Sequence, residues 1–209
     1  MKSGDRMAPD ILALDAMGVL YAAGDDVGEL LVPFVRANGG SPSTRAQVEA
    51  IYMDASIGKL TAADIWRRVG LDADLEDRYL SGHRLASGVR QCLDWAADRF
   101  ASICCISNDV DEWSKKLRER FGLERYIRDW FISGEIGARK PDERIFHVAL
   151  QRLGASADRL LFVDDRVRNL DAAARLGMQT VLVSPAPVTG HSHLWVPTLG
   201  QLPRLMQSA

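Results

Sequence analysis

The stretch ILALDAMGVLY, residues 11–21, carries the strongest signal for the fold of this 209-residue chain. Its apolar beginning has the length and composition of a buried β-strand, and Asp15 follows it directly. A turn is expected at Gly18, and Met17 stands two residues past the aspartate. The pattern predicts a strand that delivers one carboxylate to the edge of a sheet, where ligands bind in open parallel sheets.

Apolar runs of strand length alternate with helical patterns along the rest of the chain. Such alternation indicates βαβ units and a Rossmann-like parallel sheet of the α/β class. The expected strands are Ile11–Leu14, Ile103–Ile106, Trp130–Ile132, Leu160–Val163 and Thr180–Val183. The expected core helices are Val89–Phe100, Asp111–Phe121, Asp142–Leu153 and Asn169–Leu176.

The segment between the first two expected strands has a different pattern, with no convincing strand. Its expected helices are Gly28–Asn38, Ser43–Ile57, Thr61–Arg68 and Leu75–Leu80, and Ser43 and Thr61 are suitable N-caps. We therefore expect residues 23–85 to form a small α-helical cap, inserted into a core of residues 1–22 and 86–209.

The composition is that of an ordinary soluble protein, with 47% hydrophobic residues, 26% charged residues and a net charge of −2. Nothing in this balance points to nucleic acid or a membrane surface, and the apolar runs fall short of the ~20 residues that span a bilayer. The N-terminal residues 1–10 read as a loose polar tail rather than a secretory signal. Three cysteines and no paired framework favour buried thiols and a cytoplasmic location. His191 and His193 are expected in a surface loop.

Polar groups follow each of the main expected strands. Ser107 and Asn108 end the second, Asp164 and Asp165 end the fourth, and Lys140 lies in the loop GEIGARKPDE. Clustered carboxylates repel one another unless a positive charge intervenes, and Lys140 supplies one. We expect a hard divalent cation with oxygen ligands, Mg²⁺, to supply the rest.

Four motifs in this order, LDAMGVL, ISND, SGEIGARKPDERIF and LLFVDDRVRNLDAAARLGM, resemble those of the haloacid dehalogenase-like (HAD) hydrolase superfamily. The resemblance is to the branch whose helical cap follows the first motif. It implies a Mg²⁺-dependent phosphoryl transfer or hydrolysis through an aspartyl nucleophile, on a small anionic substrate, by a monomer or homodimer. The implied catalytic residues are Asp15 (nucleophile), Ser107 and Lys140; the phosphate-binding residues are Ser107, Asn108, Lys140 and Gly18; the metal ligands are Asp15, the Met17 carbonyl, Asp164 and Asp165.

Met17 departs from the family pattern, because HAD phosphatases usually carry a second aspartate at that position. A thioether cannot move protons, and general acid–base catalysis typically contributes ~10²–10⁴ in rate. A substrate with a good leaving group is one explanation. Cleavage of a carbon–phosphorus or carbon–halogen bond is another, since phosphonatase-like and dehalogenase-like relatives lack that acid. A catalytically impaired binding or regulatory protein is the third.

A few further residues are candidates for the site. A phosphonatase-like reaction needs a cap lysine to form a Schiff base, and Lys59 is the only lysine in residues 23–85. Arg139 and Arg166, each next to an expected site residue, are candidates to contact an anionic substrate.

Overall fold

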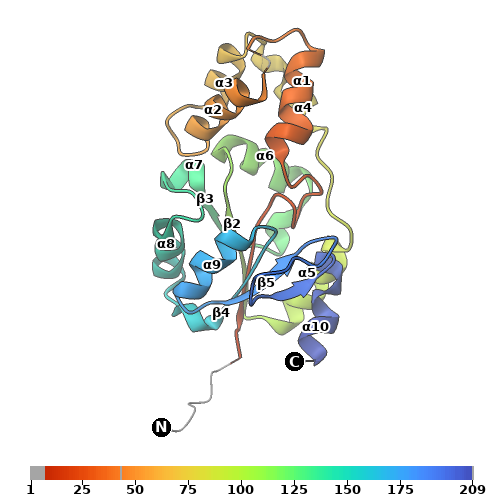
Figure 1. Ribbon diagram of the computed structural model, residues 1–209, viewed down its shortest axis with the longest axis vertical. Helices are drawn as coiled ribbons and strands as arrows, with labels where there is room; N and C mark the ends of the chain where they lie inside the picture. The colour runs from red at the N-terminus through yellow and green to blue at the C-terminus, as the bar shows by residue number, and fades with distance from the viewer. Residues whose placement is uncertain (1–7, 43, 209) are drawn as a thin grey trace.

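A six-stranded parallel sheet forms the centre of the molecule (Figure 1) in the computed structural model, which describes residues 8–42 and 44–208. The strand order is β3-β2-β1-β4-β5-β6, and every neighbouring pair is parallel. The strands are β1 (Ile11–Leu14), β2 (Ser102–Ser107), β3 (Asp129–Ile132), β4 (Leu160–Asp164), β5 (Gln179–Val183) and β6 (Leu194–Val196). The predicted Rossmann-like α/β core is confirmed.

The first strand, β1, lies inside the sheet because both of its faces are apolar. Its four residues are all buried, Leu12 and Leu14 in one apolar cluster and Ile11 and Ala13 in another. Parallel strands that are covered on both sides read as continuous apolar runs, as this one does. Asp15 follows directly, so the position of β1 fixes this carboxylate at the carboxyl end of the sheet's interior.

Helices cover both faces of the sheet (Figure 1). The core helices are α5 (Val89–Arg99), α6 (Asp111–Arg120), α7 (Ser133–Ile136), α8 (Glu143–Leu153), α9 (Val167–Arg175) and α10 (Leu202–Ser208), with 3-10 turns at Leu123–Arg125, Ala157–Arg159 and Leu199–Gln201. On one face, α8 and α9 bury Phe146 and Leu170 beside Phe162 of β4. On the other, α5 and α10 bury Leu93 and Leu202 in the apolar cluster that contains Leu12 and Leu14.

A group of short helices lies at one end of the molecule, at the top of Figure 1. We call residues 27–80 the helical segment; it contains a π-helical turn (Val27–Leu31), α1 (Val32–Ala37), α2 (Arg45–Ala55), α3 (Ala62–Arg68), a 3-10 turn (Ala73–Leu75) and α4 (Glu76–Leu80). Thr61 caps α3 as expected, in a reciprocal capping box with Asp64. The other expected N-cap, Ser43, lies outside the described residues, and α2 begins directly after Thr44. The expected helix at 28–38 is divided at the start of α1, where Pro33 stands in the first turn.

Aromatic side chains join the helical segment to α6 of the core. Trp66 and Tyr79 pack with Trp113 of α6, with ring centroids 4.8–5.7 Å apart. Both indole N–H groups donate to Oε2 of Glu76 at 2.9 Å, and Lys116 Nζ lies 2.7 Å from its Oε1. Because the two indoles share one carboxylate, this contact fixes the helical segment against the core.

The strand β6, which was not expected, follows the loop that carries His191 and His193. The run Leu194–Val196 is too short and too exposed to stand out in the sequence, yet it pairs with β5. The His193 ring lies 2.8 Å from Thr180 Oγ1 and 3.1 Å from Asp171 Oδ1. The two histidines therefore lie in a partly exposed loop, as expected, and an edge strand begins directly after them.

Other expectations from composition can be compared with the structure. Cys92, Cys104 and Cys105 are buried and free, as expected. Most of the expected N-terminal tail, residues 1–7, lies outside the described residues. Within residues 8–42 and 44–208, no helix is long and apolar enough to cross a membrane.

Candidate active site

The site residues expected from the sequence meet at the carboxyl ends of the central strands. Asp15 follows β1, Ser107 ends β2 and Asp164 ends β4. Since β1 lies between β2 and β4, these three positions are neighbours although they are far apart in the chain. Lys140 reaches the same place from the loop before α8.

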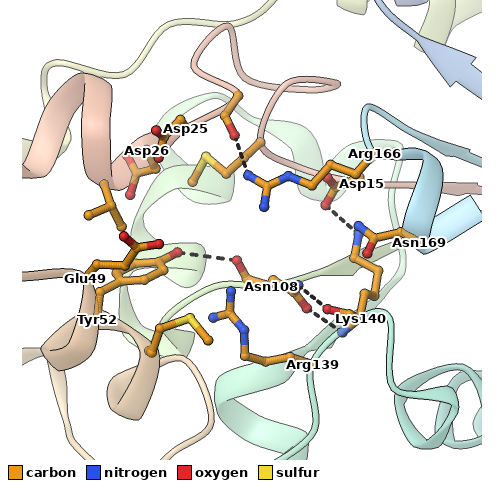
Figure 2. A pocket seen from close by; sticks show the side chains of 14 residues that line it. Asp15, Asp25, Asp26, Glu49, Tyr52, Asn108, Arg139, Lys140, Arg166 and Asn169 are labelled. Carbon is orange, nitrogen blue, oxygen red and sulfur yellow. Dashed lines mark hydrogen bonds and ion pairs between the residues drawn. The ribbon is translucent and has the colours of Figure 1, made fainter. Parts of the chain in front are cut away.

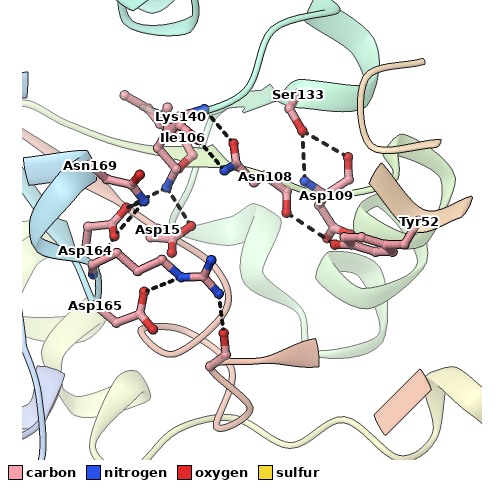
Figure 3. Close-up of polar contacts among 12 residues, drawn as sticks. Asp15, Tyr52, Ile106, Asn108, Asp109, Ser133, Lys140, Asp164, Asp165 and Asn169 are labelled. Atoms are coloured by element: carbon pink, nitrogen blue, oxygen red, sulfur yellow. Dashed lines mark hydrogen bonds and ion pairs between the residues drawn. The ribbon is translucent and has the colours of Figure 1, made fainter. Parts of the chain in front are cut away.

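Lys140 makes the central ion pairs of the site (Figure 3). Its Nζ lies 2.7 Å from Asp15 Oδ1 and 2.7 Å from Asp164 Oδ2, and it donates to the Ile106 carbonyl at 2.6 Å. Burial by itself lowers the pKa of Lys140, but the two carboxylates outweigh it and raise the pKa above its ordinary value. The lysine therefore stays charged and holds the two acids at a fixed separation.

Asn108 holds the backbone of Lys140 in place. Its Nδ2 donates to the Lys140 carbonyl at 2.9 Å, and the Lys140 N–H donates to its Oδ1 at 2.8 Å. Both amide atoms of Asn108 are thus engaged with this loop. The geometry gives Asn108 a positioning part, and its contact with phosphate stays a prediction.

Three carboxylates gather beside Lys140. One oxygen from each of Asp15, Asp164 and Asp165 lies within 4.8 Å of the others. Burial raises the pKa of Asp15 to about 6, with Lys140 opposing it, and raises the pKa of Asp165 to about 7, with the charges of Asp15 and Asp164 adding to it. Oδ1 of Asp165 is buried and accepts no hydrogen bond from any residue that the structure describes. An all-oxygen donor set with mutual repulsion fits a hard divalent cation such as Mg²⁺.

Asp164 is oriented by a residue that the sequence did not single out. Asn169 Nδ2 donates to both of its oxygens, at 3.0 and 3.1 Å, and the Arg166 N–H donates to Oδ1 at 2.8 Å. Asn169 lies in the first turn of α9, the helix that starts just past the strand end. The sequence could have indicated Asn169 by this position, because an amide in the first turn of the helix faces back toward the carboxylates at the strand end.

Ser107 and Met17 take different places around Asp15. The Ser107 hydroxyl is fully buried and has no hydrogen-bond partner among the described residues, which is costly unless a ligand satisfies it. Met17 is buried and lines the cavity beside Asp15. The part of the Met17 carbonyl as a metal ligand remains a prediction.

Gly18 forms the turn that follows the nucleophile candidate. Its φ is +78°, a left-handed conformation that favours glycine, and its N–H donates to the carbonyls of Tyr21 and Ala23 at 2.9 Å. The turn brings the chain back past Asp165 before it enters the helical segment. A contact between Gly18 and phosphate remains a prediction.

A cavity of about 70 Å³ lies between the helical segment and the strand ends (Figure 2). The core contributes Arg139, Lys140, Arg166 and Asn169, among others, and the chain entering the helical segment and α2 contribute Asp25, Asp26, Glu49, Tyr52 and Met53. The sequence offered no signal for this second group, because neither spacing nor composition marks residues that only tertiary packing brings to the cavity.

A second set of contacts fixes α2 above the site. The Ser133 hydroxyl donates to the Ser56 carbonyl at 2.5 Å and accepts from the Asp109 N–H at 3.0 Å. Arg139 donates to the Ser56 hydroxyl, and Tyr52 donates to the Asn108 carbonyl at 3.3 Å. The helical segment is therefore fixed to the core at two places, around Glu76 and around Ser56.

Residues 9–177 match the family model of the haloacid dehalogenase-like hydrolases. The chain belongs to this family. The four motifs fall within the matched range, apart from the last residue of the fourth. Asp15 and Asp164 stand at the ends of β1 and β4, and Lys140 stands in the loop before α8.

Two curated relatives are phosphatases. A glyceraldehyde 3-phosphate phosphatase of Methanopyrus kandleri is 36% identical over 75 residues, which are 35% of this chain and 31% of the relative. A phosphoglycolate phosphatase of Pseudomonas syringae is 29% identical over 98 residues, which are 46% of this chain and 36% of the relative. The matched part thus spans about a third of each relative's length.

Solved structures share the fold of this HAD-like hydrolase. A HAD family enzyme of Bacteroides thetaiotaomicron, in complex with magnesium and inorganic phosphate, has a TM-score of 0.73 at 20% identity and covers 88% of this chain and 98% of its own. The L-2-haloacid dehalogenase of Xanthobacter autotrophicus has a TM-score of 0.68 at 18% identity and covers 95% and 98%. At these identities the likeness concerns the fold.

Proposed function

We propose that this protein is a Mg²⁺-dependent phosphohydrolase that acts on a small anionic substrate through Asp15. The observation that carries the proposal is the buried Asp15–Lys140–Asp164 contact at the strand ends, with Asp165 beside it. Burying these charged side chains costs free energy of folding, and phosphoryl transfer uses such charges to position and neutralise the transferred group. The names of the phosphatase relatives support the same reaction class.

In the first step, an Asp15 oxygen attacks the phosphorus and the bond to the leaving oxygen breaks, giving an aspartyl-phosphate. Lys140 neutralises the equatorial oxygens, and the buried Ser107 hydroxyl donates to one of them. Asp15, Asp164 and Asp165 would hold Mg²⁺, which supplies further positive charge next to the transferred group. The leaving group departs with its electron pair.

In the second step, water attacks the phosphorus and releases Asp15. The protons of that water end on the phosphate and in solution, because Met17 offers no carboxylate to accept one. Because position 17 carries no carboxylic acid, it cannot donate a proton to an alkoxide leaving group. Substrates whose leaving group is stable as an anion, such as acyl phosphates, therefore suit the site best.

We also propose that residues 23–85 act as the cap and residues 1–22 and 86–209 as the catalytic core. The cavity between them supports this division, since α2 and the chain leading into the helical segment line one side of it. The Schiff-base alternative loses support, because the Lys59 side chain is 66% exposed and lies 3.4 Å from Asp54. A catalytic amine of that kind needs burial.

The test compares wild type with Met17→Asp in the presence of Mg²⁺. Phosphate release is measured from acetyl phosphate, p-nitrophenyl phosphate and simple sugar phosphates. We expect wild type to cleave the activated substrates, and Met17→Asp to gain ~10-fold or more on the sugar phosphates. Asp15→Asn is the matched control and should lose turnover of all of them.

If neither protein releases phosphate from any substrate, the proposal fails. Halide release from 2-haloacids and phosphate release from phosphonoacetaldehyde would then be measured, since both reactions dispense with an acid at position 17. A protein inactive in all three assays that still binds phosphate would be a binding module.

A further inference from the structure

The cavity is divided by charge between its two sides (Figure 2). The core side carries Arg139, Lys140 and Arg166, which we call the basic floor, together with Asp15. The opposite side carries Asp25, Asp26 and Glu49, which we call the acidic wall. An enzyme for anions has an evident use for the floor but none for the wall.

One cation of the basic floor forms no ion pair with the acids of the site. Lys140 is neutralised by Asp15 and Asp164, and Arg166 Nε lies 3.7 Å from Asp165. Arg139 forms no ion pair with any described residue; its guanidinium reaches the Ser56 hydroxyl and lies 5.9 Å from the centroid of the Tyr52 ring. Burial lowers the pKa of Arg139 but leaves it a cation. The three bases balance the three carboxylates Asp15, Asp164 and Asp165, so with Mg²⁺ held by those carboxylates, as proposed, this side of the cavity favours an anionic group.

The acidic wall keeps negative charge in excess. Asp25 and Glu49 share a single arginine, Arg45, at 2.7 and 3.6 Å. Glu49 is the more weakly held of the two, and its side chain is 48% exposed. Asp26 is buried and held by the Tyr79 hydroxyl at 2.7 Å and by His83 Nε2 at 2.9 Å. An anionic tail on the substrate would thus meet repulsion at this wall, and a cationic tail would meet attraction.

We propose that the substrate is zwitterionic, with its phosphoryl group on the basic floor and a positively charged amine toward Asp25 and Glu49. The inference rests on the proposed function, which places the phosphoryl group at Asp15. The basic floor and the acidic wall line one cavity, so a small molecule can present its phosphoryl group to one and its amine to the other. Glu49 is then the residue that selects among small phosphates.

Three esters of similar size test the charge of the tail: 2-aminoethyl phosphate, 2-hydroxyethyl phosphate and carboxymethyl phosphate. Their binding to the wild-type protein with Mg²⁺ is measured by calorimetry, and repeated on Asp15→Asn if turnover contributes heat. We expect the amine to bind tightest and the carboxylate weakest, with ~10-fold or more between them. Equal affinities, a tightest-binding carboxylate or an amine no better than the hydroxyl would overturn the proposal.

Substitutions at position 49 sharpen the test. Glu49→Gln should shrink the preference for the amine, and Glu49→Lys should reverse it in favour of carboxymethyl phosphate. Asp54→Asn is the matched control, because it removes one charge from the same helix at a residue outside the cavity lining, and it should keep the wild-type order. An unchanged order in Glu49→Lys would contradict the assignment.

Turnover of acetyl phosphate is followed separately and tests the proposed function alone. Turnover without the expected order of affinities leaves the phosphohydrolase in place and removes the zwitterionic substrate. Binding in the expected order without turnover removes the hydrolase and keeps the charge selection.

Discussion

The carboxylate of Asp165 occupies the space that a side chain at position 18 would need. A Cβ built on Gly18 falls 2.5 Å from Asp165 Oδ2 and 2.7 Å from its Cγ. Any residue larger than glycine would displace the metal-ligand candidate, in addition to straining a backbone with φ of +78°.

Gly18→Ala should therefore lose Mg²⁺ affinity as well as stability. We expect Mg²⁺ binding, measured by calorimetry, to weaken ~10-fold or more and the free energy of unfolding to fall by ~2–4 kcal/mol. Gly39→Ala is the control, because Gly39 has φ of +77° with no atom within 4 Å of the added Cβ. The prediction is wrong if both variants lose the same stability and Mg²⁺ affinity is unchanged.

Lys140→Met should destabilise the protein strongly. The substitution leaves Asp15 and Asp164 buried without their cation, and breaking a buried pair typically costs ~3–5 kcal/mol. Denaturant unfolding at neutral pH measures the loss. Part of it should return at low pH, where the carboxyls are protonated. Lys59→Met, at an exposed lysine, should change stability by less than ~0.5 kcal/mol.

The stability of the metal-free protein should increase as the pH falls from about 8 to about 5. Burial raises the pKa of Asp15 to about 6 and of Asp165 to about 7, above the value near 4 in an unfolded chain. In that window the folded state binds more protons than the unfolded state, so lowering the pH favours folding. Glu76, whose pKa is lowered, acts in the opposite direction only below about pH 5.

Mg²⁺ should show the opposite pH dependence, because it binds the ionised carboxylates and competes with their protons. The increase in melting temperature on adding Mg²⁺ should be larger at about pH 8 than at about pH 5.5. Thermal unfolding with and without Mg²⁺ measures both effects. Metal-free stability that rises steadily with pH over this window would contradict the raised pKa values.

Glu76→Gln should loosen the helical segment from the core. The substitution removes the charge that pairs with Lys116 and weakens the acceptor that Trp66 and Trp113 share, at a cost of ~1–3 kcal/mol. Asp77→Asn removes the neighbouring contact of Lys116 on an 84% exposed side chain and should cost less than ~0.5 kcal/mol. Tryptophan fluorescence during unfolding reports both. Equal effects would argue against the shared carboxylate as a fixing contact.

The core strands and the order of the site residues along the chain follow from local sequence patterns. Apolar runs such as Ile11–Leu14 are local patterns, and a strand buried on both faces needs nothing more to be recognised. Parallel connection then brings every strand's carboxyl end to one edge, so the sequence predicts that Asp15, Ser107 and Asp164 are neighbours. The sequence also predicts Lys140 at this edge, because clustered carboxylates require a cation.

Tertiary structure alone decided the rest, because it depends on which surfaces meet. The pairing of β6 depends on the β5 edge and not on its own three residues. Asn169 matters because α9 directs its amide at Asp164. Glu49 and Asp25 reach the cavity only because the helical segment is fixed to the core through Glu76 and Ser56. Burial and distance, which set the charge of that cavity, are properties of packing between segments and have no local signature in the chain.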